Sequence, residues 1–512
     1  MALIHDVSEY FSSEKFGFDK ALYARGYIVS RDRIDPPHQE WRHARIGGLH
    51  VSYDPRNRFA SATCRGHFVA TIGLVIDAEA PGRHPSETVG RACAELARSR
   101  EAFFEALDGW GGRFVVLFGS DDAPFLAGDA TAMRTAFHAP GRPGLVASHA
   151  ALVAEAIGAE RNGQLDALKA TQEWKDRRAR YLPGAITAWK GVRFLTANTA
   201  LSLADGRLVR FWPRTRLGRA APKQAAAIAR DNMTRQLEWV QAQGRPVVCS
   251  LTAGLDSRVT AAIARPFEGI SYFTYHHAHS ERDAQDVILA QEIAARLGLP
   301  HSVLPAKRRA SRRLGEILLR NNAIPHLTGV AEAYARRFPQ NAIHIRSNLS
   351  EIGRAFYKKE YGDRTSTMGQ WLRERLGLRS RPGDTQTFGP RQMARVWRRL
   401  PHNKIAVRAF ADWRTSVGFQ KAGGGIDKPD LFYWEHRMSC WHGRVLLESD
   451  IAFDTMSPFN HRQVLSALLM TDLADRRASA AHRLIVEAGA PEIADVMVNA
   501  IAPEAVALQA AA

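Results

Sequence analysis

The chain has 512 residues, enough for two to four domains at the usual size of roughly 100–200 residues each. Apolar residues make up 45% and charged residues 24%, as in soluble globular proteins, and 39 Gly and 24 Pro residues exclude a collagen-like or low-complexity polymer. The formal net charge of +18 favours anionic partners such as nucleotides, nucleic acid, acidic glycans or anionic membrane surfaces, and an Arg-rich solvated surface is the alternative interpretation.

Cysteine usage and hydropathy indicate the compartment. Cys64, Cys93, Cys249 and Cys440 are far apart and form no CxxC pair, so we expect small buried hydrophobes rather than a zinc ribbon or a disulfide scaffold. No stretch reaches the roughly 18 uncharged apolar residues that a bilayer span requires. The first residues lack the basic segment and apolar run of a signal peptide. These features predict a cytoplasmic protein without membrane insertion.

The sequence pattern of residues 1–213 is typical of a β-rich domain. Short apolar runs at 66–76, 112–118, 144–148 and 191–195 alternate with turn signals, which is typical of strands. The residues 121–124 predict a hairpin turn and 125–127 the returning strand. Pro213 marks a break in the chain. We therefore expect an α+β sandwich in this half.

From about residue 220 the pattern changes to alternating helices and strands. We expect a helix over 224–243, a buried strand over 246–251, and a helix that begins at Ser257. A strand over 269–275, a helix over 283–297 that ends at Gly298, and a strand over 301–304 follow. This alternation predicts an α/β domain with a parallel sheet over residues 214–512. The Arg-rich segment 373–399 is either a solvated insertion or a site for a polyanion.

The segment 247–260 carries the clearest chemical signal. An apolar strand runs into a tight loop of small residues, and a helix follows at once. Ala253 and Gly254 let backbone amides approach a ligand, and those amides with the helix dipole form a cradle for anions. Thr252 and Ser257 add hydroxyl groups, and Asp256 is suited to hold a Mg²⁺ that bridges phosphates. The pattern predicts binding of a triphosphate, although the Walker motif is absent there.

This loop resembles the SGGxDS loop of the ATP-pyrophosphatases, with Thr252 and Ala253 in place of the first Ser and Gly. Within that class the chain is similar to the asparagine synthetase family over nearly its whole length. The segments 272–275 and 286–298 and His301 match the order of elements after the loop, and 457–462 is similar to the family's VPFLD segment. The segment 346–352 is similar to its SGEGSDE motif, with Glu351 in place of the metal-binding Asp. The N-terminal half matches through 111–117, 128–130, 147–148 and 211–212.

The resemblance implies an N-terminal-nucleophile-hydrolase-like sandwich followed by an ATP-pyrophosphatase domain that uses ATP and Mg²⁺. It implies that Asp256 and Glu351 hold the metal and, with Arg258, serve catalysis. The residues it assigns to nucleotide binding are Leu251, Thr252, Ala253, Gly254, Leu255, Ser257, Tyr275 and Ser347.

Two departures from the family change the expected activity. The family's glutaminase uses a Cys directly after the initiator Met, whereas this chain has Ala2, and Cys64 lies too far along to carry a free amine. Without the nucleophile there is no acyl-enzyme and no ammonia from glutamine. The family also supplies a Lys near the end of the synthetase half, but this chain has none after Lys428. Arg258, Arg354 and Lys358 are the candidates for the missing charge.

Three hypotheses remain. The first is an AMP-forming amide ligase, similar to β-lactam synthetases and lasso-peptide cyclases, which adenylates a small-molecule or peptide carboxylate for attack by an amine. The second is a tRNA-modifying ATP-pyrophosphatase, which the charge motivates but the amidotransferase-like first half disfavours, so nucleic acid is not the expected partner. The third is a non-catalytic scaffold that keeps the ATP site. The substrate itself is not predicted.

Overall fold

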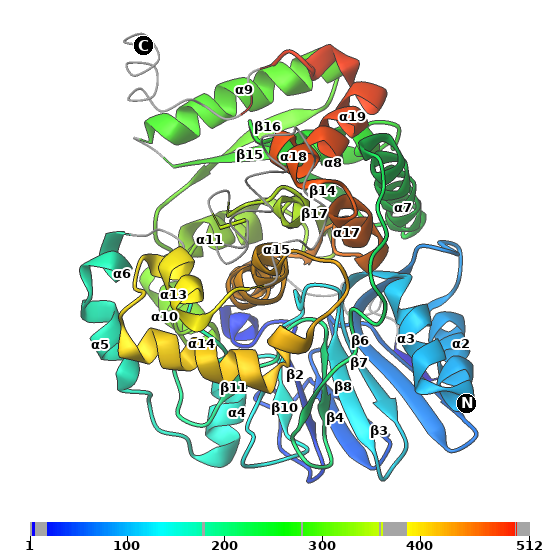
Figure 1. Cartoon of the computed structure of the whole chain (residues 1–512), viewed down its shortest axis with the longest axis vertical. Helices are drawn as coiled ribbons and strands as arrows, with labels where there is room; N and C mark the ends of the chain where they lie inside the picture. Colours follow the sequence, from blue (N-terminus) through cyan, green and yellow to red (C-terminus); the bar gives the residue numbers. More distant parts are fainter. Residues whose placement is uncertain are drawn as a thin grey trace, which may run out of the picture.

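The computed structural model describes residues 3–5, 18–176, 180–277, 280–357, 360–361, 387–496 and 498. Two antiparallel sheets occupy the lower half of the view in Figure 1, and a parallel sheet lies above them. The expected α+β sandwich followed by a parallel sheet is therefore confirmed at the level of sheet architecture.

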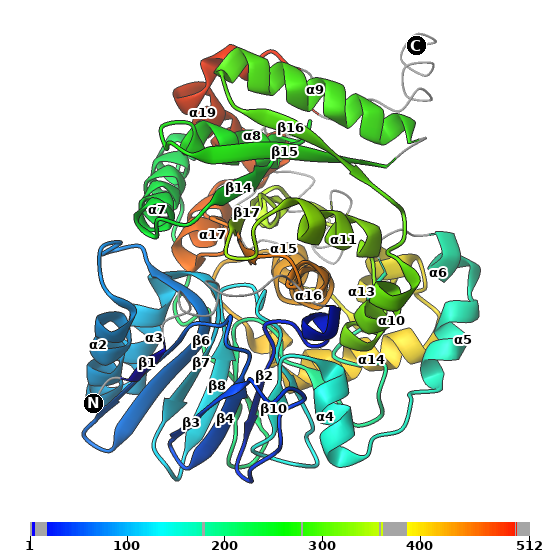
Figure 2. The same ribbon diagram turned by 180° about the vertical axis from the view of Figure 1, so that it is seen from behind.

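The first antiparallel sheet has seven strands, which include the predicted hairpin. In spatial order they are β1 (Leu3–His5), β5 (Phe59–Cys64), β6 (His67–Asp77), β7 (Trp110–Gly119), β8 (Pro124–Gly128), β12 (Thr199–Ser202) and β13 (Leu208–Arg210). Gly119 pairs with Pro124 across the turn. Helices α2 (Pro85–Arg98) and α3 (Arg100–Asp108) cover the outer face of this sheet, as Figure 2 shows from behind.

The second antiparallel sheet faces the first across an apolar layer. Its order is β11 (Arg193–Phe194), β9 (Phe137–His138), β10 (Val146–Ala147), β2 (Tyr27–Ser30), β4 (Leu49–Tyr53) and β3 (Arg42–Ile46). Val29 and Val51 from this sheet meet Ile72, Val115 and Leu117 from the other in one buried cluster. Helix α4 (Ala150–Ile157) packs on β9 and β10. The N-terminal part is thus a sandwich of two sheets with helices outside both.

The parallel sheet has five strands in the order β16 (His301–Ala306), β15 (Ile270–His277), β14 (Val247–Ser250), β17 (Ile343–Ile345) and β18 (Asp454–Met456). Val247 and Cys249 point to one face and Val248 to the other, and all three are buried. A continuous apolar strand is what a sheet covered on both faces requires. Strand β14 is central, and β15 and β17 are its parallel neighbours. The carboxyl ends of these three strands therefore lie together at one edge of the sheet.

Helices cover both faces of the parallel sheet. One layer contains α7 (Pro222–Ala242), α8 (Leu255–Ala264), α9 (Glu281–Leu297), α17 (Arg462–Leu469), α18 (Leu473–Ala478) and α19 (Ala480–Gly489), and the other contains α10 (Arg312–Asn321) and α11 (Thr328–Arg337). The predicted helix that ends at Gly298 is α9, where Gly298 adopts the left-handed conformation. Helix α8 starts two residues earlier than expected, because Gly254 is its N-cap and Asp256 lies in its first turn.

The remaining helices lie partly between the sheets and partly at the side of the molecule. They are α5 (Gln164–Ala170), α6 (Gln172–Asp176), α13 (Pro390–Arg398), α14 (Lys404–Ser416), α15 (Lys428–Phe432), the π-helix η4 (Tyr433–His442) and α16 (Gly443–Ser449), with short 3₁₀ turns η1 (Phe18–Ala21), η2 (Ser350–Gly353), η3 (Phe419–Lys421) and η5 (Pro491–Ile493). Of the Arg-rich segment 373–399, only the part from 387 onward is described, and α13 forms there. The central position of α15, η4 and α16 is visible in Figures 1 and 2.

Buried ion pairs join the N-terminal sandwich to the later part of the chain. Arg113 Nη2 lies 2.8 Å from Asp450 Oδ2, and Arg25 Nη1 lies 2.9 Å from Asp454 Oδ1. Arg210 donates to both carboxylate oxygens of Glu435, at 2.6 and 2.8 Å. Asp450 and Glu435 are fully buried. Removing one partner of such a pair leaves an uncompensated buried charge, so these contacts hold the two parts in a fixed arrangement.

Two further expectations concern chemistry and compartment. All four cysteines are free, and Cys93, Cys249 and Cys440 are buried. Among the described residues, no helix has the length and apolar character needed to cross a bilayer.

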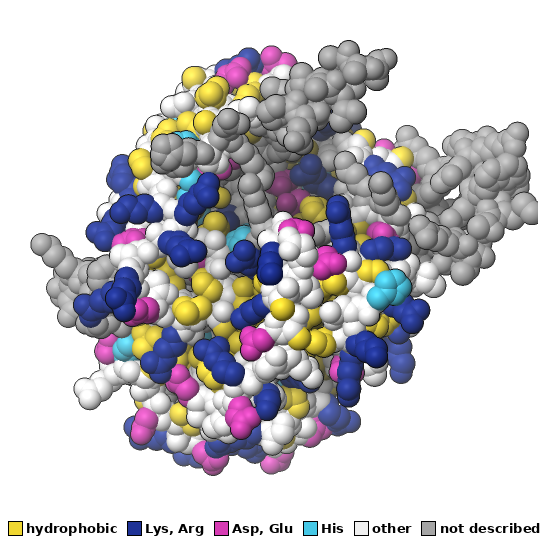
Figure 3. Space-filling view, turned by 90° about the vertical axis from the view of Figure 1, so that its left-hand side faces the viewer, with side chains coloured by type: hydrophobic (Ala, Val, Ile, Leu, Met, Phe, Trp, Pro, Cys, Tyr) yellow, Lys and Arg dark blue, Asp and Glu magenta, His cyan; other side chains and the backbone are white. Residues whose placement is uncertain are grey.

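Figure 3 shows one face of the molecule, on which Lys and Arg side chains are spread among acidic and apolar ones rather than gathered into one patch.

Candidate functional site

The structure brings the two predicted metal-binding acids together at one edge of the parallel sheet. Asp256 lies in the first turn of α8, directly after β14, and Glu351 lies in η2, directly after β17. Strands β14 and β17 are parallel neighbours, so residues that follow their carboxyl ends share an edge, where ligands bind in open α/β sheets. Asp256 and Glu351 interact electrostatically. The fold therefore places two carboxylates beside each other from distant parts of the sequence.

The environment of Glu351 is unusual for a carboxylate. Its Oε2 is enclosed and has no hydrogen-bond partner among the residues that the structure describes. Burial, first, and the neighbouring charge of Asp256, second, raise the pKa of Glu351 to about 7, while Arg354 and Arg437 oppose the rise. A carboxyl group held partly protonated beside a second carboxylate is the arrangement that a bound cation would relieve.

Asp256 is held by two partners from the segment that carries Glu351. The Ser350 hydroxyl donates a hydrogen bond to Asp256 Oδ1, and Arg354 Nη1 lies 2.5 Å from the same oxygen. Arg354 Nε also donates to Ser479 Oγ at 3.1 Å. Arg354, one of the candidates for the missing charge, thus reaches the acid pair. Lys358, another candidate, lies outside the described residues.

The loop residues occupy the predicted place, but their amides already have partners. The amide of Thr252 donates to Ser257 Oγ at 3.2 Å, and that of Gly254 donates to Thr252 Oγ1 at 3.2 Å. The amide of Ala253 donates to Asp286 Oδ1 of α9 at 2.6 Å. A carboxylate therefore occupies one donor of the cradle, which shows that the Ala253 amide is placed to bind an anionic oxygen.

The other predicted ligands have different surroundings. Leu251 and Leu255 are buried apolar side chains, so they position the loop through packing. Tyr275 lies near the end of β15 and is partly exposed, beside the loop strand. Ser347 follows β17, and its hydroxyl is buried without a hydrogen-bond partner. Its free hydrogen-bonding capacity fits a ligand contact at this edge.

Arg258 does not join the acid pair. Its guanidinium donates to the carbonyl oxygens of Ala253 and Val496, at 3.0 and 2.5 Å, and its side chain is only 1% exposed. Burial lowers its pKa. In this arrangement Arg258 braces the back of the loop against the C-terminal segment.

Sequence reasoning missed two residues of the site. His482 of α19 is buried near Asp256 and Arg354, donates to the Ser350 backbone, and has its pKa lowered to about 4 chiefly by burial. Arg437 of η4 interacts electrostatically with Glu351. Neither residue lies in a motif, and each reaches the site through tertiary packing alone. No local signal in the sequence identifies them.

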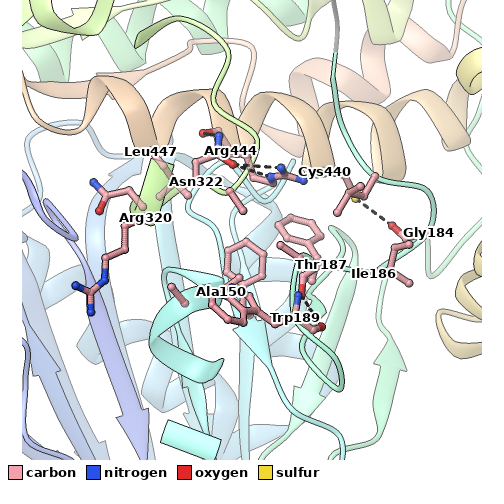
Figure 4. A pocket seen from close by; sticks show the side chains of 17 residues that line it. Ala150, Gly184, Ile186, Thr187, Trp189, Arg320, Asn322, Cys440, Arg444 and Leu447 are labelled. Carbon is pink, nitrogen blue, oxygen red and sulfur yellow. Dashed lines mark hydrogen bonds between the residues drawn. The ribbon is translucent and has the colours of Figure 1, made fainter. Parts of the chain in front are cut away.

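A separate cavity lies at the seam between the sandwich and the later helices (Figure 4). Its labelled lining includes Thr187, Trp189, Cys440 and Leu447, and Arg444 donates to Asn322 Oδ1 at 3.2 Å. Its cavity volume is about 30 Å³, which is enough room for ordered water. It contains neither member of the acid pair, so we place the candidate site at the sheet edge.

Comparisons with known proteins identify no family. No family model matches the chain, and no curated protein sequence matches it significantly. Among solved structures, glutamine phosphoribosylpyrophosphate amidotransferase from B. subtilis, complexed with ADP and GMP, is similar at 11% identity and a TM-score of 0.21, over 64% of this chain and 70% of that one. A structure described as the allosteric regulatory enzyme of purine biosynthesis is similar at 10% identity, with the same TM-score and coverage. At this TM-score neither likeness supports an inference about this chain.

Proposed function

We propose that the chain is an ATP-dependent, AMP-forming amide ligase of the asparagine synthetase type, which adenylates a substrate carboxylate for attack by an amine. The observation that carries the proposal is the pairing of Asp256 with Glu351 at the edge of the parallel sheet. The triphosphate-type loop lies at the same edge, between β14 and α8.

The residues present fit a nucleotide with its metal. Mg²⁺ is usually held by one or two carboxylates plus substrate phosphates, and Asp256 and Glu351 supply two carboxylates, one with an unpartnered buried oxygen. The loop amides and the positive end of α8 suit the phosphates. When bound, the metal would supply charge neutralisation to the phosphates.

Arg354 has a specific place in this proposal. Its guanidinium lies 2.5 Å from Asp256 Oδ1 and neutralises that carboxylate. With a cation on Asp256, the charge of Arg354 would be available to the leaving pyrophosphate, where a positioned cation stabilises the transition state. Arg354 would thereby replace the Lys that the sequence lacks after Lys428.

The amine in this proposal comes with a substrate. Position 2 is Ala, which offers no thiol for glutamine hydrolysis; it lies outside the described residues. The carboxylate and the amine therefore belong to small-molecule or peptide substrates, on one molecule or two.

The proposal is tested by pyrophosphate release and AMP formation from Mg·ATP with a panel of carboxylate and amine substrates. We expect Asp256→Asn to reduce the rate by about 100-fold or more, as loss of one charge-stabilising group does in other enzymes. Asp231→Asn is the matched control, because Asp231 is exposed and contacts only the adjacent Arg230. Pyrophosphate release that is unchanged in Asp256→Asn would show that the assignment is wrong.

A non-catalytic ATP-binding scaffold is the second candidate. The observation in its favour is that all three loop amides already have partners within the protein. Calorimetry with Mg·ATP separates the two candidates when it is combined with turnover: binding without turnover on any substrate favours the scaffold, and binding with turnover eliminates it.

A further inference from the structure

One cation near the acid pair has no counter-ion among the described residues. Arg437 projects from the π-helix η4 and interacts electrostatically with Glu351. Within the described part of the chain its Nε is enclosed without a hydrogen-bond partner, and Nη1 donates to the hydroxyl of Tyr181 at 3.4 Å. Within the described ranges it forms no ion pair, whereas Arg354 at the same site pairs with Asp256.

Four aromatic rings form a collar around this guanidinium. Its central carbon lies 4.9 Å from the ring centroids of Phe356 and Trp441 and 5.7 Å from those of Tyr181 and Tyr433. Cation–π contacts at these distances orient a guanidinium. Burial keeps the Tyr433 hydroxyl neutral by raising its pKa. The collar therefore fixes the direction of Arg437, which forms no ion pair among the described residues and acts on Glu351 only through longer-range electrostatics.

The collar is exposed to solvent at Phe356. Phe356 is 39% exposed, although it stacks on Tyr433 with ring centroids 4.4 Å apart. Arg437 and Trp441 are also partly exposed. An exposed aromatic ring next to an unpaired guanidinium offers an apolar contact and a bidentate donor pair at once.

We propose that Arg437 binds the carboxylate of the substrate, and that the aromatic collar selects carboxylates with an apolar or aromatic skeleton. This inference rests on the proposed ligase function and names the class of its substrate. A carboxylate bound by Arg437 would lie beside Glu351, at the proposed site. A guanidinium also binds anionic phosphate oxygens. In the proposed site, however, the loop and Arg354 already offer donors to the phosphates. The planar fork and the rings of the collar favour the carboxylate.

The test uses calorimetry on the full chain with 3-phenylpropionate and hexanoate, and with the uncharged 3-phenylpropionamide as the matched probe. We expect both acids to bind and the amide not to bind. Arg437→Gln should weaken binding of the acids at least tenfold, and Arg437→Lys, which keeps the charge without the fork, should weaken it less. Arg408→Gln is the control, because Arg408 is exposed on α14.

A second variant addresses the collar without removing the charge. Phe356→Ala should weaken the binding of 3-phenylpropionate. It should leave the binding of propionate, which lacks the ring, unchanged. Failure of both acids to bind the wild-type chain, or binding of the amide as tightly as its acid, would overturn the inference.

Titrations with pyrophosphate and Mg·ATP separate this inference from the proposed function. We expect Arg437→Gln to weaken binding of the acids by a larger factor than it changes the affinity for pyrophosphate or Mg·ATP. If Arg437→Gln weakens binding of pyrophosphate and Mg·ATP but not of the acids, Arg437 is a phosphate ligand and the inference is wrong. The proposed ATP site would still stand. If the wild-type chain binds the acids through Arg437 but never binds Mg·ATP, the proposed function fails and the carboxylate site stands.

Discussion

At the scale of single residues, the raised pKa of Glu351 is the feature with the most direct consequence. Asp256 and burial together raise the pKa of Glu351 to about 7. Arg354 and Arg437 act in the opposite direction, and the buried His482 nearby stays neutral because its pKa is lowered. A cation must therefore displace a proton from this pair at neutral or acidic pH.

We expect the affinity for Mg²⁺ to rise as the pH increases from about 6 to about 8, because Glu351 keeps its proton to a higher pH than an ordinary carboxyl group. In Asp256→Asn the neighbouring charge is gone, so the pH dependence should move to lower pH and the affinity should fall. Calorimetric titration with Mg²⁺ across this range measures both effects. A pH-independent affinity in the wild-type chain would contradict the raised pKa of Glu351.

At the scale of elements, the contact between the loop and α9 bears on the proposed phosphate site. Asp286 accepts the amide of Ala253 at 2.6 Å. A phosphate oxygen that binds this amide has to displace the carboxylate. Helix α9 therefore competes with the ligand for one donor.

We expect Asp286→Ala to strengthen binding of Mg·ATP severalfold, because the competing carboxylate and its negative charge are removed. Asp283→Ala, on the same helix but bonded to His277, is the matched control and should have little effect. Competition between ATP and a fluorescent ATP analogue measures the change. Weaker binding in Asp286→Ala would show instead that the carboxylate supports the nucleotide site.

Much of the second half of the fold could be predicted from local pattern. The apolar run at 246–251 and the long helix that ends at Gly298 appear in the structure close to the expected bounds. Local periodicity and turn residues determine such elements. The start of α8 was missed by two residues, because Gly254 serves as an N-cap without a capping side chain.

The site was predictable only as far as its segments follow neighbouring strands. Asp256 and Glu351 each come directly after a buried strand, so parallel pairing of those strands was enough to bring them together. Asp286, His482 and Arg437 reach the site from helices far along the chain. Their side-chain directions depend on packing, which one sequence does not reveal.

At the scale of the whole molecule, buried charges tie the sandwich to the later helices. Asp450 is fully buried and faces Arg113 and Arg134 of the sandwich. Glu435 of η4 accepts from Arg210 and Asn198 in the same way. The helix that carries Arg437 therefore depends on the first half for its position.

We expect Asp450→Ala to lower the free energy of unfolding by about 3–5 kcal/mol, because it leaves buried guanidinium groups without a counter-ion. Urea denaturation followed by tryptophan fluorescence and by circular dichroism measures the loss, and both midpoints should move together. Asp205→Ala is the control, since Asp205 is on the surface and pairs with the neighbouring Arg207. A small change in Asp450→Ala, similar to that of the control, would contradict the role of this ion pair.

The sandwich contributes three arginines to buried ion pairs with the later part of the chain, namely Arg25 with Asp454, Arg113 with Asp450 and Arg210 with Glu435. Excising the sandwich would remove these guanidinium partners, although Asp454 would keep its contact with Arg245. It would also expose to water the apolar surfaces that now surround these carboxylates. The later part of the chain therefore needs the sandwich for its own folding, whatever reaction the sandwich performs.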